Sequence, residues 1–267
     1  PEDCDLLVIA GPKSDLEKSE REIIQNYLRK GGDALFLIEH TLVTTPAKPL
    51  SNEELLKNPS LNAILNEWGV NVLYDIVVDL ASHAGEDVGS PATNNYMPHK
   101  GIIRDLDYTF YVRPRSISVV DQRRPTIKVA PVVLTMSKTQ SWGESHRELE
   151  VKYDEGIDFP GPVPISYVMW EPKDEGDLSD TRIMVFTDAD FLTNLYIGFY
   201  SNAQMGLNAI NWLTEVDYQS FVETRDLEVT QLKLTSLQKR RVIVILVLIP
   251  IFIGLLGLMV WSKNSLS

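Results

Sequence analysis

The sequence Asp-Leu-Leu-Val-Ile-Ala-Gly-Pro at residues 5–12 and the sequence Ala-Leu-Phe-Leu-Ile at residues 34–38 decide the fold. Each contains a short apolar run, which is typical of a strand buried on both faces of a parallel sheet. Between them, an amphipathic helix is predicted to begin near Ser14 or Asp15 and to end at Gly31 and Gly32. Strand, helix and strand in this order predict a right-handed βαβ unit.

Further apolar or alternating runs follow along the chain. The class they predict is α/β, with a mainly parallel, flavodoxin-like sheet and flanking helices. Strands are expected at residues 72–78, 108–120, 126–136, 165–170 and 183–186, and helices at residues 53–57, 61–68 and 205–213.

A second decisive stretch lies near the end of the chain, at residues 242–261. These twenty residues carry no charge, and fifteen of them are Val, Ile, Leu or Phe. As a helix they extend about 30 Å, the thickness of the hydrocarbon core of a bilayer. We therefore expect one C-terminal transmembrane helix, because a helix in a soluble core rarely stays apolar on every face for this length. Pro250, Gly254 and Gly257 are candidates for close packing against another helix.

The remaining residues, about 240 in number, are enough for one large domain or two small ones. The formal net charge is −12, with 37 acidic against 25 basic residues, which argues against nucleic acid as the partner. The single cysteine, Cys4, excludes an internal disulfide framework and a cysteine-based zinc site.

Motifs for cofactors and catalysis are absent from the sequence. The first turn, at residues 11–15, lacks the G-x-G-x-x-G spacing of dinucleotide-binding proteins, and no Walker sequence occurs, so any ATPase must be a separate polypeptide. A nucleophile elbow of the form G-x-S-x-G or G-x-C-x-G is also absent, and Cys4 is badly placed before the first strand. The histidines follow no recognisable triad order: His40, His83, His99 and His146.

A long loop is predicted at residues 81–104, where Gly, Pro and Asn recur without a period. His83 and His99 lie in it with two acidic residues between them, but their spacing matches no ligand pattern. Solvated loop histidines are the preferred interpretation, and no metal site is predicted.

The candidate ligand or partner loop follows the last predicted strand. Asp188 and Asp190 come directly after residues 183–186, and Asn194 follows shortly after. Because the carboxyl ends of parallel strands open onto the ligand crevice, a site is expected here. The alternative is that the two aspartates only cap or brace the loop before the helix at residues 205–213.

Several segments resemble a known family when taken together and in order. The first is residues 6–12 with the helix that ends at Gly31 and Gly32. The second is residues 188–194 with the following residues 207–213, and the third is the apolar anchor that contains Pro250 and Gly257. Residues 135–142 and 160–164 also resemble segments of the family. The chain resembles the gliding-motility (GldG-like) accessory components of ABC-type transport systems. The resemblance implies an extracytoplasmic domain similar in fold to class I glutamine amidotransferase-like domains, beside separate permease and ATPase chains.

The expected organisation has four parts: an extracytoplasmic α/β domain at residues 1–225, a juxtamembrane connector at 226–241, the transmembrane helix at 242–261 and a tail at 262–267. The charges around the span conflict with this orientation. Lys239, Arg240 and Arg241 precede it and only Lys263 follows, which by the positive-inside rule puts the domain in the cytoplasm. A further span upstream of Pro1, missing from this chain, would remove the conflict, and we expect the domain on the periplasmic side of the inner membrane.

The function expected from these observations is that of a non-enzymatic, membrane-anchored accessory subunit. Its partners would be the permease and ATPase chains and, through the C-terminal helix, membrane lipid. The alternative is a membrane-anchored receptor or degenerate hydrolase that uses the loop with Asp188 and Asp190.

Overall fold

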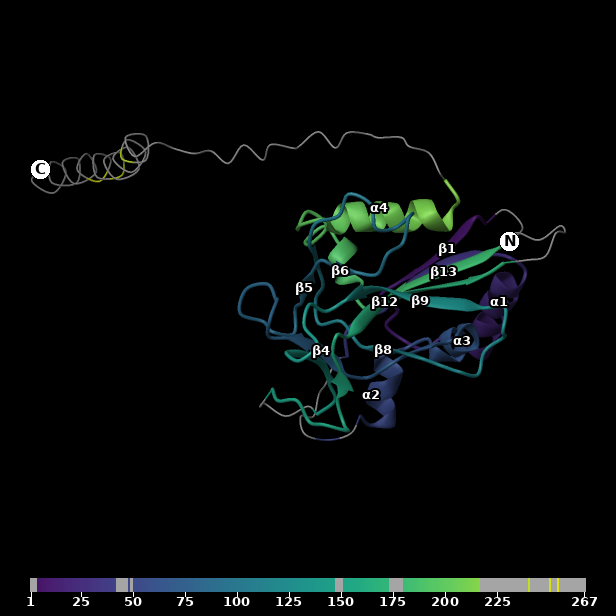
Figure 1. The fold of residues 1–267 in the computed structure, drawn as a ribbon, viewed down its shortest axis with the longest axis horizontal. Helices are drawn as coiled ribbons and strands as arrows, with labels where there is room; N and C mark the ends of the chain where they lie inside the picture. Colours follow the sequence, from purple (N-terminus) through teal and green to yellow (C-terminus); the bar gives the residue numbers. More distant parts are fainter. Residues whose placement is uncertain are drawn as a thin grey trace, which may run out of the picture. The chain divides into compact units, whose positions relative to one another are not determined.

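A computed structural model describes residues 4–41, 48, 50–146, 151–172 and 180–216, together with Arg240, Pro250 and Gly254. Contacts divide the chain into two units, Pro1–Tyr218 and Gln219–Ser267. All the strands and helices named below belong to the first unit (Figure 1).

A six-stranded mixed sheet forms the centre of the first unit. In spatial order its strands are β1 (Leu6–Ala10), β2 (Asp33–Leu37), β13 (Thr181–Phe186), β12 (Pro164–Glu171), β9 (Lys128–Leu134) and β6 (Asn95–Tyr96). The first three strands are parallel, as expected, whereas β12, β9 and β6 each pair antiparallel with their neighbours.

The mainly parallel, flavodoxin-like sheet expected from the sequence is thus replaced by a mixed one. The reason lies in the connections. Only nine residues separate the end of β12 at Glu171 from the start of β13 at Thr181. A crossover between parallel strands needs about a dozen residues or more, so this connection favours an antiparallel pair.

Helices cover both faces of the sheet. One face carries α1 (Lys18–Arg29), α3 (Asn62–Leu65) and η1 (Asn66–Trp68), and the other carries η2 (Asp190–Leu192) and α4 (Asn202–Leu213) (Figure 1). A short helix, α2 (Asn52–Lys57), begins with a capping box between Ser51 and Glu54.

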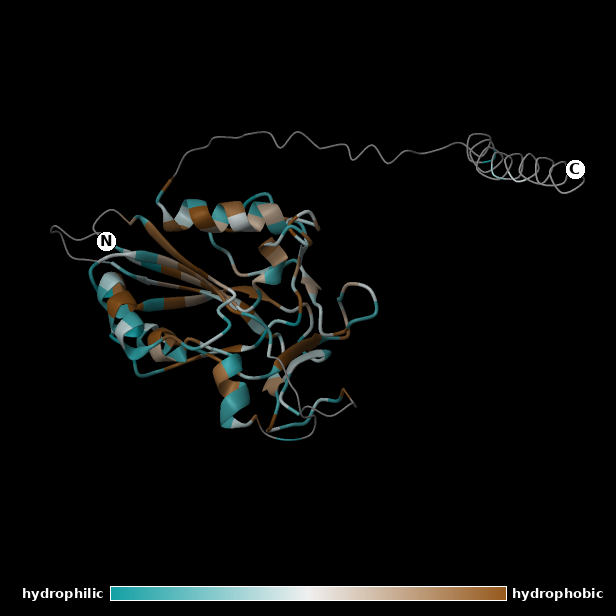
Figure 2. Cartoon of the chain, turned by 180° about the vertical axis from the view of Figure 1, so that it is seen from behind, coloured by the Kyte–Doolittle hydropathy of each residue, from teal (hydrophilic) through white to brown (hydrophobic). Residues whose placement is uncertain are grey.

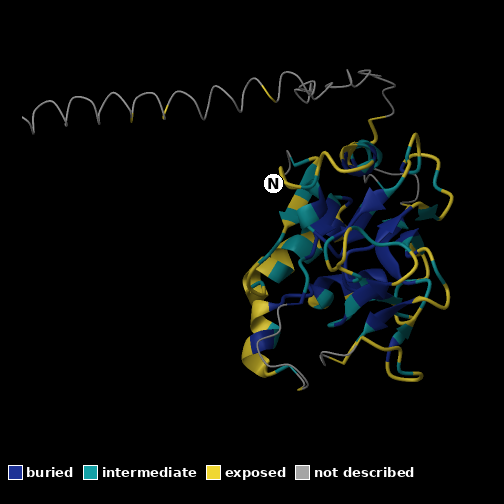
Figure 3. Cartoon of the chain, turned by 90° about the vertical axis from the view of Figure 1, so that its left-hand side faces the viewer, coloured by how far each residue is buried: buried dark blue, intermediate teal, exposed yellow. Residues whose placement is uncertain are grey.

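The core divides according to the alternation of side chains along the strands. On β2, Ala34 and Phe36 face the layer that contains α1, whereas Leu35 and Leu37 face the layer that contains α4. The strands at the centre of the sheet are buried almost throughout, as Figure 3 shows in dark blue. Burial of both faces explains why these strands appear in the sequence as continuous apolar runs.

Three small sheets complete the unit. They pair β3 (Val70–Val72) with β8 (Ile117–Val119), β4 (Ile76–Asp79) with β10 (Ser141–Glu144) and β11 (Phe159–Pro160), and β5 (Ala92–Thr93) with β7 (Thr109–Phe110).

These small sheets correct two sequence predictions. The single strands expected at residues 72–78 and 108–120 are each broken into two. Buried polar residues lie in the breaks. In the first break, the Asp75 carboxylate accepts a 2.8 Å hydrogen bond from the Ser116 backbone. In the second break, Arg115, the residue before Ser116, is fully buried. The loop expected at residues 81–104 also contains β5 and β6, and β6 extends the main sheet.

The predicted transmembrane segment, residues 242–261, lies outside the described residues except at two positions. Pro250 and Gly254 are helical and exposed, and Gly257 is among the residues not described. Among the described residues, no helix combines the length and the apolarity that a membrane span requires. The packing role of these three residues stays a prediction.

The end of α1 is tied to the sheet by one aromatic side chain. The Tyr27 hydroxyl donates to the backbone carbonyls of Cys4, 3.2 Å away, and Asp33, 3.1 Å away, at the starts of β1 and β2. Gly32 makes this contact possible, because a Cβ at this position would lie 2.3 Å from the Tyr27 ring.

We expect Gly32→Ala to lower the free energy of unfolding by about 1–3 kcal/mol, because the ring of Tyr27 must move and its two hydrogen bonds weaken. Urea denaturation measures the change. Gly198→Ala is the matched control, since a Cβ at Gly198 has open space around it. Equal stabilities of the two variants would contradict this account of α1.

Candidate functional site

The three parallel strands end at the same level of the sheet. Ala10 of β1 pairs with Leu37 of β2, and Leu37 pairs with Phe186 of β13. The backbone pairing continues one residue further, with Gly11 N donating to Leu37 O at 2.8 Å and Ile38 N donating to Phe186 O at 2.9 Å. The loops that follow the three strands therefore leave the same edge side by side.

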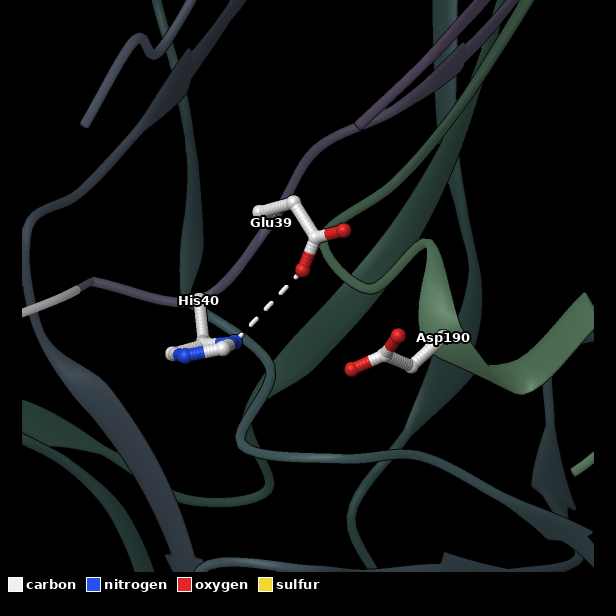
Figure 4. A group of neighbouring side chains, drawn as sticks. All are labelled: Glu39, His40 and Asp190. Carbon is white, nitrogen blue, oxygen red and sulfur yellow. Dashed lines mark ion pairs between the residues drawn. The ribbon is translucent and has the colours of Figure 1, made fainter. Parts of the chain in front are cut away.

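Four charged or titratable side chains from these loops come together. Lys13 follows β1, Glu39 and His40 follow β2, and Asp190 follows β13. The Lys13 Nζ lies 3.2 Å from Glu39 Oε1, and the His40 Nδ1 lies 3.5 Å from Glu39 Oε2. Figure 4 shows the carboxylate of Asp190 beside Glu39 and His40, and one ligand atom from each of these three residues lies within 4.8 Å of the others. We call these four residues the carboxyl-edge cluster.

Gly11 makes room for this cluster. Its φ of 57° lies in the left-handed region that glycine adopts readily. A Cβ at this position would lie 2.9 Å from Glu39 Oε1. The chain can therefore turn out of β1 and bring Lys13 to Glu39 without displacing the carboxylate.

The two carboxylates of the cluster have opposite electrostatic surroundings. The His40 ring and the Lys13 ammonium hold the pKa of Glu39 below its ordinary value, although partial burial opposes them. Burial raises the pKa of Asp190, and the nearby Glu39 carboxylate raises it further. Within the part of the chain that the structure describes, no hydrogen bond is made by the Asp190 carboxylate, so its charge is the less well compensated one.

Asp188 lies behind the cluster and acts as a structural brace. It is 1% exposed, and its two carboxylate oxygens accept backbone hydrogen bonds, each of 2.8 Å, from Val112 and Asp190. Burial raises the pKa of Asp188 to about 8 in spite of these two donors. The brace fixes the turn that presents the side chain of Asp190 to the edge.

The two interpretations of the predicted loop thus apply to different residues. Asp188 braces the loop, as the structural alternative required, whereas Asp190 faces the cluster at the edge where a site was expected. Asn194 is exposed and is not part of the cluster. The functional role of Asp188, Asp190 and Asn194 stays a prediction.

The sequence-based prediction did not include Lys13, Glu39 and His40 in the site. A signal for them exists, because Glu39 and His40 come directly after the apolar run at residues 34–38, and Lys13 follows the turn after β1. The rule that picked out Asp190, that polar residues after a parallel strand lie at the ligand edge, applies equally to these loops.

Glu39, His40 and Asp190 form one of two groups among the described residues that could hold a metal ion; the other is Glu144, His146 and Asp158. Carboxylate and imidazole ligands together suit Zn²⁺. In the second group the carboxylates of Glu144 and Asp158 are already hydrogen-bonded to backbone N–H groups. The carboxyl-edge cluster is therefore the more available of the two.

The loop histidines considered earlier belong to neither group. The His99 ring packs edge-on against Trp212 at 5.2 Å, and its Nδ1 accepts a 3.2 Å hydrogen bond from the Ile102 backbone. Burial lowers its pKa. His83 forms an isolated bridge with Pro91.

Comparison with known proteins gives one family match. Residues 1–102 of the chain match the family model described as an ABC-type uncharacterized transport system. The match includes β1, β2 and the cluster residues that follow them, but not Asp190. It supports an accessory role in an ABC-type transport system. No curated protein matches the sequence.

A likeness of fold extends further along the chain. A solved structure titled "mmIFT52 N-terminal domain" superposes with a TM-score of 0.55 over 80% of this chain and 79% of that chain, at 18% sequence identity. At this identity the likeness concerns the fold alone.

The burial of Asp188 predicts a particular pH dependence of stability. Its ordinary pKa is 3.8 and its folded pKa is about 8, so the unfolded state loses the proton first as the pH rises. The contribution of Asp188 to stability is complete below about pH 4 and is lost as the pH rises to about 8, by up to about 1.4 kcal/mol per pH unit.

In urea denaturation between pH 4 and pH 8, wild-type stability should fall relative to that of Asp188→Asn, whose side chain does not titrate. Asp121→Asn, at an exposed position, is the control and should stay parallel to the wild type. Parallel curves for Asp188→Asn and wild type would show that Asp188 is ionised in the folded protein throughout this range.

Proposed function

We propose that this chain is a non-enzymatic accessory subunit of an ABC-type transport system, of the gliding-motility type, anchored in the membrane by residues 242–261. Its α/β domain lies on the extracytoplasmic side and binds a partner subunit or the cargo through the carboxyl-edge cluster. The observation that carries the proposal is the convergence of Lys13, Glu39, His40 and Asp190 at one edge, three of them within the residues that match the transport family.

The charges of the cluster favour a particular kind of partner. Lys13 and His40 compensate Glu39, which leaves the Asp190 carboxylate available for a cation from outside. A Lys or Arg side chain of a partner protein supplies such a charge, and a partly buried carboxylate makes a stronger pair with it than an exposed one. We therefore assign the cluster to a partner surface that presents a basic residue.

The placement of Cys4 supports a function without catalysis. Cys4 precedes β1, and β1 is five residues long, so Cys4 lies at the edge opposite the cluster, about 17 Å away. A thiol at this distance cannot act as the nucleophile for groups at the carboxyl edge.

Purification of the tagged full-length chain from native membranes in mild detergent tests the proposal. Mass spectrometry should find an ATPase with a Walker sequence and a polytopic permease. Asp190→Lys should reduce their recovery at least tenfold, because it places a cation where the partner's basic residue binds. Asp121→Lys, the same change at an exposed acidic position, should leave recovery unchanged.

Two results would count against the proposal in different ways. Absence of both transporter chains would contradict the accessory role. Their undiminished recovery with Asp190→Lys would leave that role intact but remove the cluster from the interface.

A second candidate function is favoured by the ligand atoms of Glu39, His40 and Asp190, which lie within 4.8 Å of one another. It is that of an anchored receptor or degenerate hydrolase that binds a divalent cation at this loop. Calorimetric titration with Zn²⁺ separates the two functions. Micromolar binding that disappears in Asp190→Asn would favour the second function, and no binding would favour the first.

A further inference from the structure

The segment from η2 to the end of α4 differs in charge from the rest of the chain. Residues 191–214 contain no Asp, Glu, Lys or Arg, in a protein with 62 such residues among 267. It is the longest uncharged run in the part of the chain that the structure describes. In an acidic protein, such a run is expected to be buried.

Much of this segment is nevertheless exposed. Its large apolar side chains include several of the most exposed in the described residues: Leu195 at 68%, Tyr200 at 60%, Leu207 at 50%, Phe199 at 47%, Ile210 at 41% and Ile197 at 39%. Together these six side chains expose an area on the order of 600 Å², which is the size of the largest apolar patch on a typical monomer. Patches of that size are often functional.

The exposed side chains are held in a defined conformation. Buried Asn202, at the start of α4, exchanges two hydrogen bonds with the Phe110 backbone, of 2.8 and 3.1 Å. The Phe110 ring packs against Tyr196 at 5.4 Å and Phe199 at 5.9 Å. The loop before α4 is therefore anchored to β7, and its apolar side chains form a fixed surface.

Helix α4 has apolar side chains on both its faces. Met205, Ala209 and Leu213 are fully buried against the sheet. The opposite face has a stripe formed by Ala203, Leu207, Ile210 and Thr214, which are exposed or partly exposed. In Figure 2, hydrophobic (brown) and hydrophilic (teal) segments alternate along α4. Large apolar side chains that stay exposed together on a folded protein often mark an interaction site, so this stripe indicates a partner that covers it.

The spacing of the stripe indicates what that partner is. Positions 203, 207, 210 and 214 follow one another at intervals of four, three and four residues, the repeat of a seam between two helices. The partner therefore presents a helix with an apolar stripe of its own, and a second α4 has that stripe with the same spacing. No charged residue of α4 flanks the stripe to select a different helix.

Charge favours a second copy as well. Two chains of formal charge −12 repel each other over most of their surfaces. Residues 191–214 form the one long uncharged stretch of the described chain, so the segment itself brings no charged side chain against its equivalent in a second copy. Homodimer interfaces are also more apolar than other interfaces and enriched in aromatic residues, as this segment is.

We propose that α4 and the loop at residues 193–200 form the interface between two copies of this chain. A two-fold axis brings the stripe of one α4 against that of the other, with Leu207 near the axis. The loops on either side widen the contact toward the ~800 Å² per partner of a stable interface. The inference does not depend on which transport partners the chain has.

Sedimentation equilibrium of the full-length chain in a density-matched detergent tests the proposal. The wild type should have twice the chain mass of 30.2 kDa. The double variant Leu207→Glu with Ile210→Glu should dissociate to single chains or dimerise at least tenfold more weakly. Ile23→Glu, at a 65% exposed apolar position of α1, is the matched control and should remain dimeric.

Cross-linking in membrane vesicles is the second measurement, with a substitution that perturbs the fold less. In a Cys4→Ser background, oxidation of Leu207→Cys should give a disulfide-linked dimer, and Ile23→Cys should not. The cysteines of the two copies meet only if the axis passes near residue 207.

The proposal is overturned if the wild type sediments as a single chain at every concentration. It is also overturned if the double glutamate variant stays fully dimeric, since the interface would then lie elsewhere, for example in residues 242–261. The protein could instead be a monomer that binds lipid through the stripe. In that case the emission of a fluorophore attached to the cysteine of the Leu207→Cys variant would shift to shorter wavelength when phosphatidylcholine vesicles are added, and the dimer proposal would be overturned.

Discussion

The register of three parallel strands is the constraint on which the candidate site depends. Ala10, Leu37 and Phe186 are neighbours across β1, β2 and β13, so the loops after them leave the sheet together. A shift of one strand by a single residue would move its loop along the edge and turn its side chains to the other face. The buried apolar residues that hold the register, such as Phe36 and Val185, therefore also position Lys13, Glu39 and Asp190.

Apolar patterning made part of this architecture predictable. The strand, helix and strand at the amino end and the strand before Asp188 are visible as apolar runs or an amphipathic pattern bounded by glycine or polar residues. Strand direction was not predictable from these runs, because the short connection between β12 and β13 determines it. The partners of Asp190 were missed for a related reason: sequence shows which residues end a strand, but only the register shows that Glu39 and Asp190 meet. The short strands around Asp75 and Arg115 depend on buried polar contacts that leave no periodic pattern.

The first unit has two surfaces of contrasting chemistry. The carboxyl-edge cluster is charged, partly buried and small, as suits recognition of one complementary charge. The outer face of α4 and its loop is uncharged and apolar, which suits a larger contact without electrostatic selection. Three of the four cluster residues, Lys13, Glu39 and His40, lie within the residues that match the transport family, whereas Asp190, α4 and its loop lie outside that match. The two surfaces belong to different elements, so the proposed self-association through α4 does not involve the residues of the cluster.

Lys13, Glu39 and Asp190 lie close enough for the charge of each to act on the others. Carbon-13 NMR titration of the Asp190 carboxyl tests this charge coupling most directly. We expect Glu39→Gln to lower the pKa of Asp190, because a neighbouring negative charge is removed, and Lys13→Gln to raise it, because a positive charge is removed. A pKa of Asp190 that is the same in both variants as in the wild type would contradict the account, since the three loops would then not meet at the edge of the sheet.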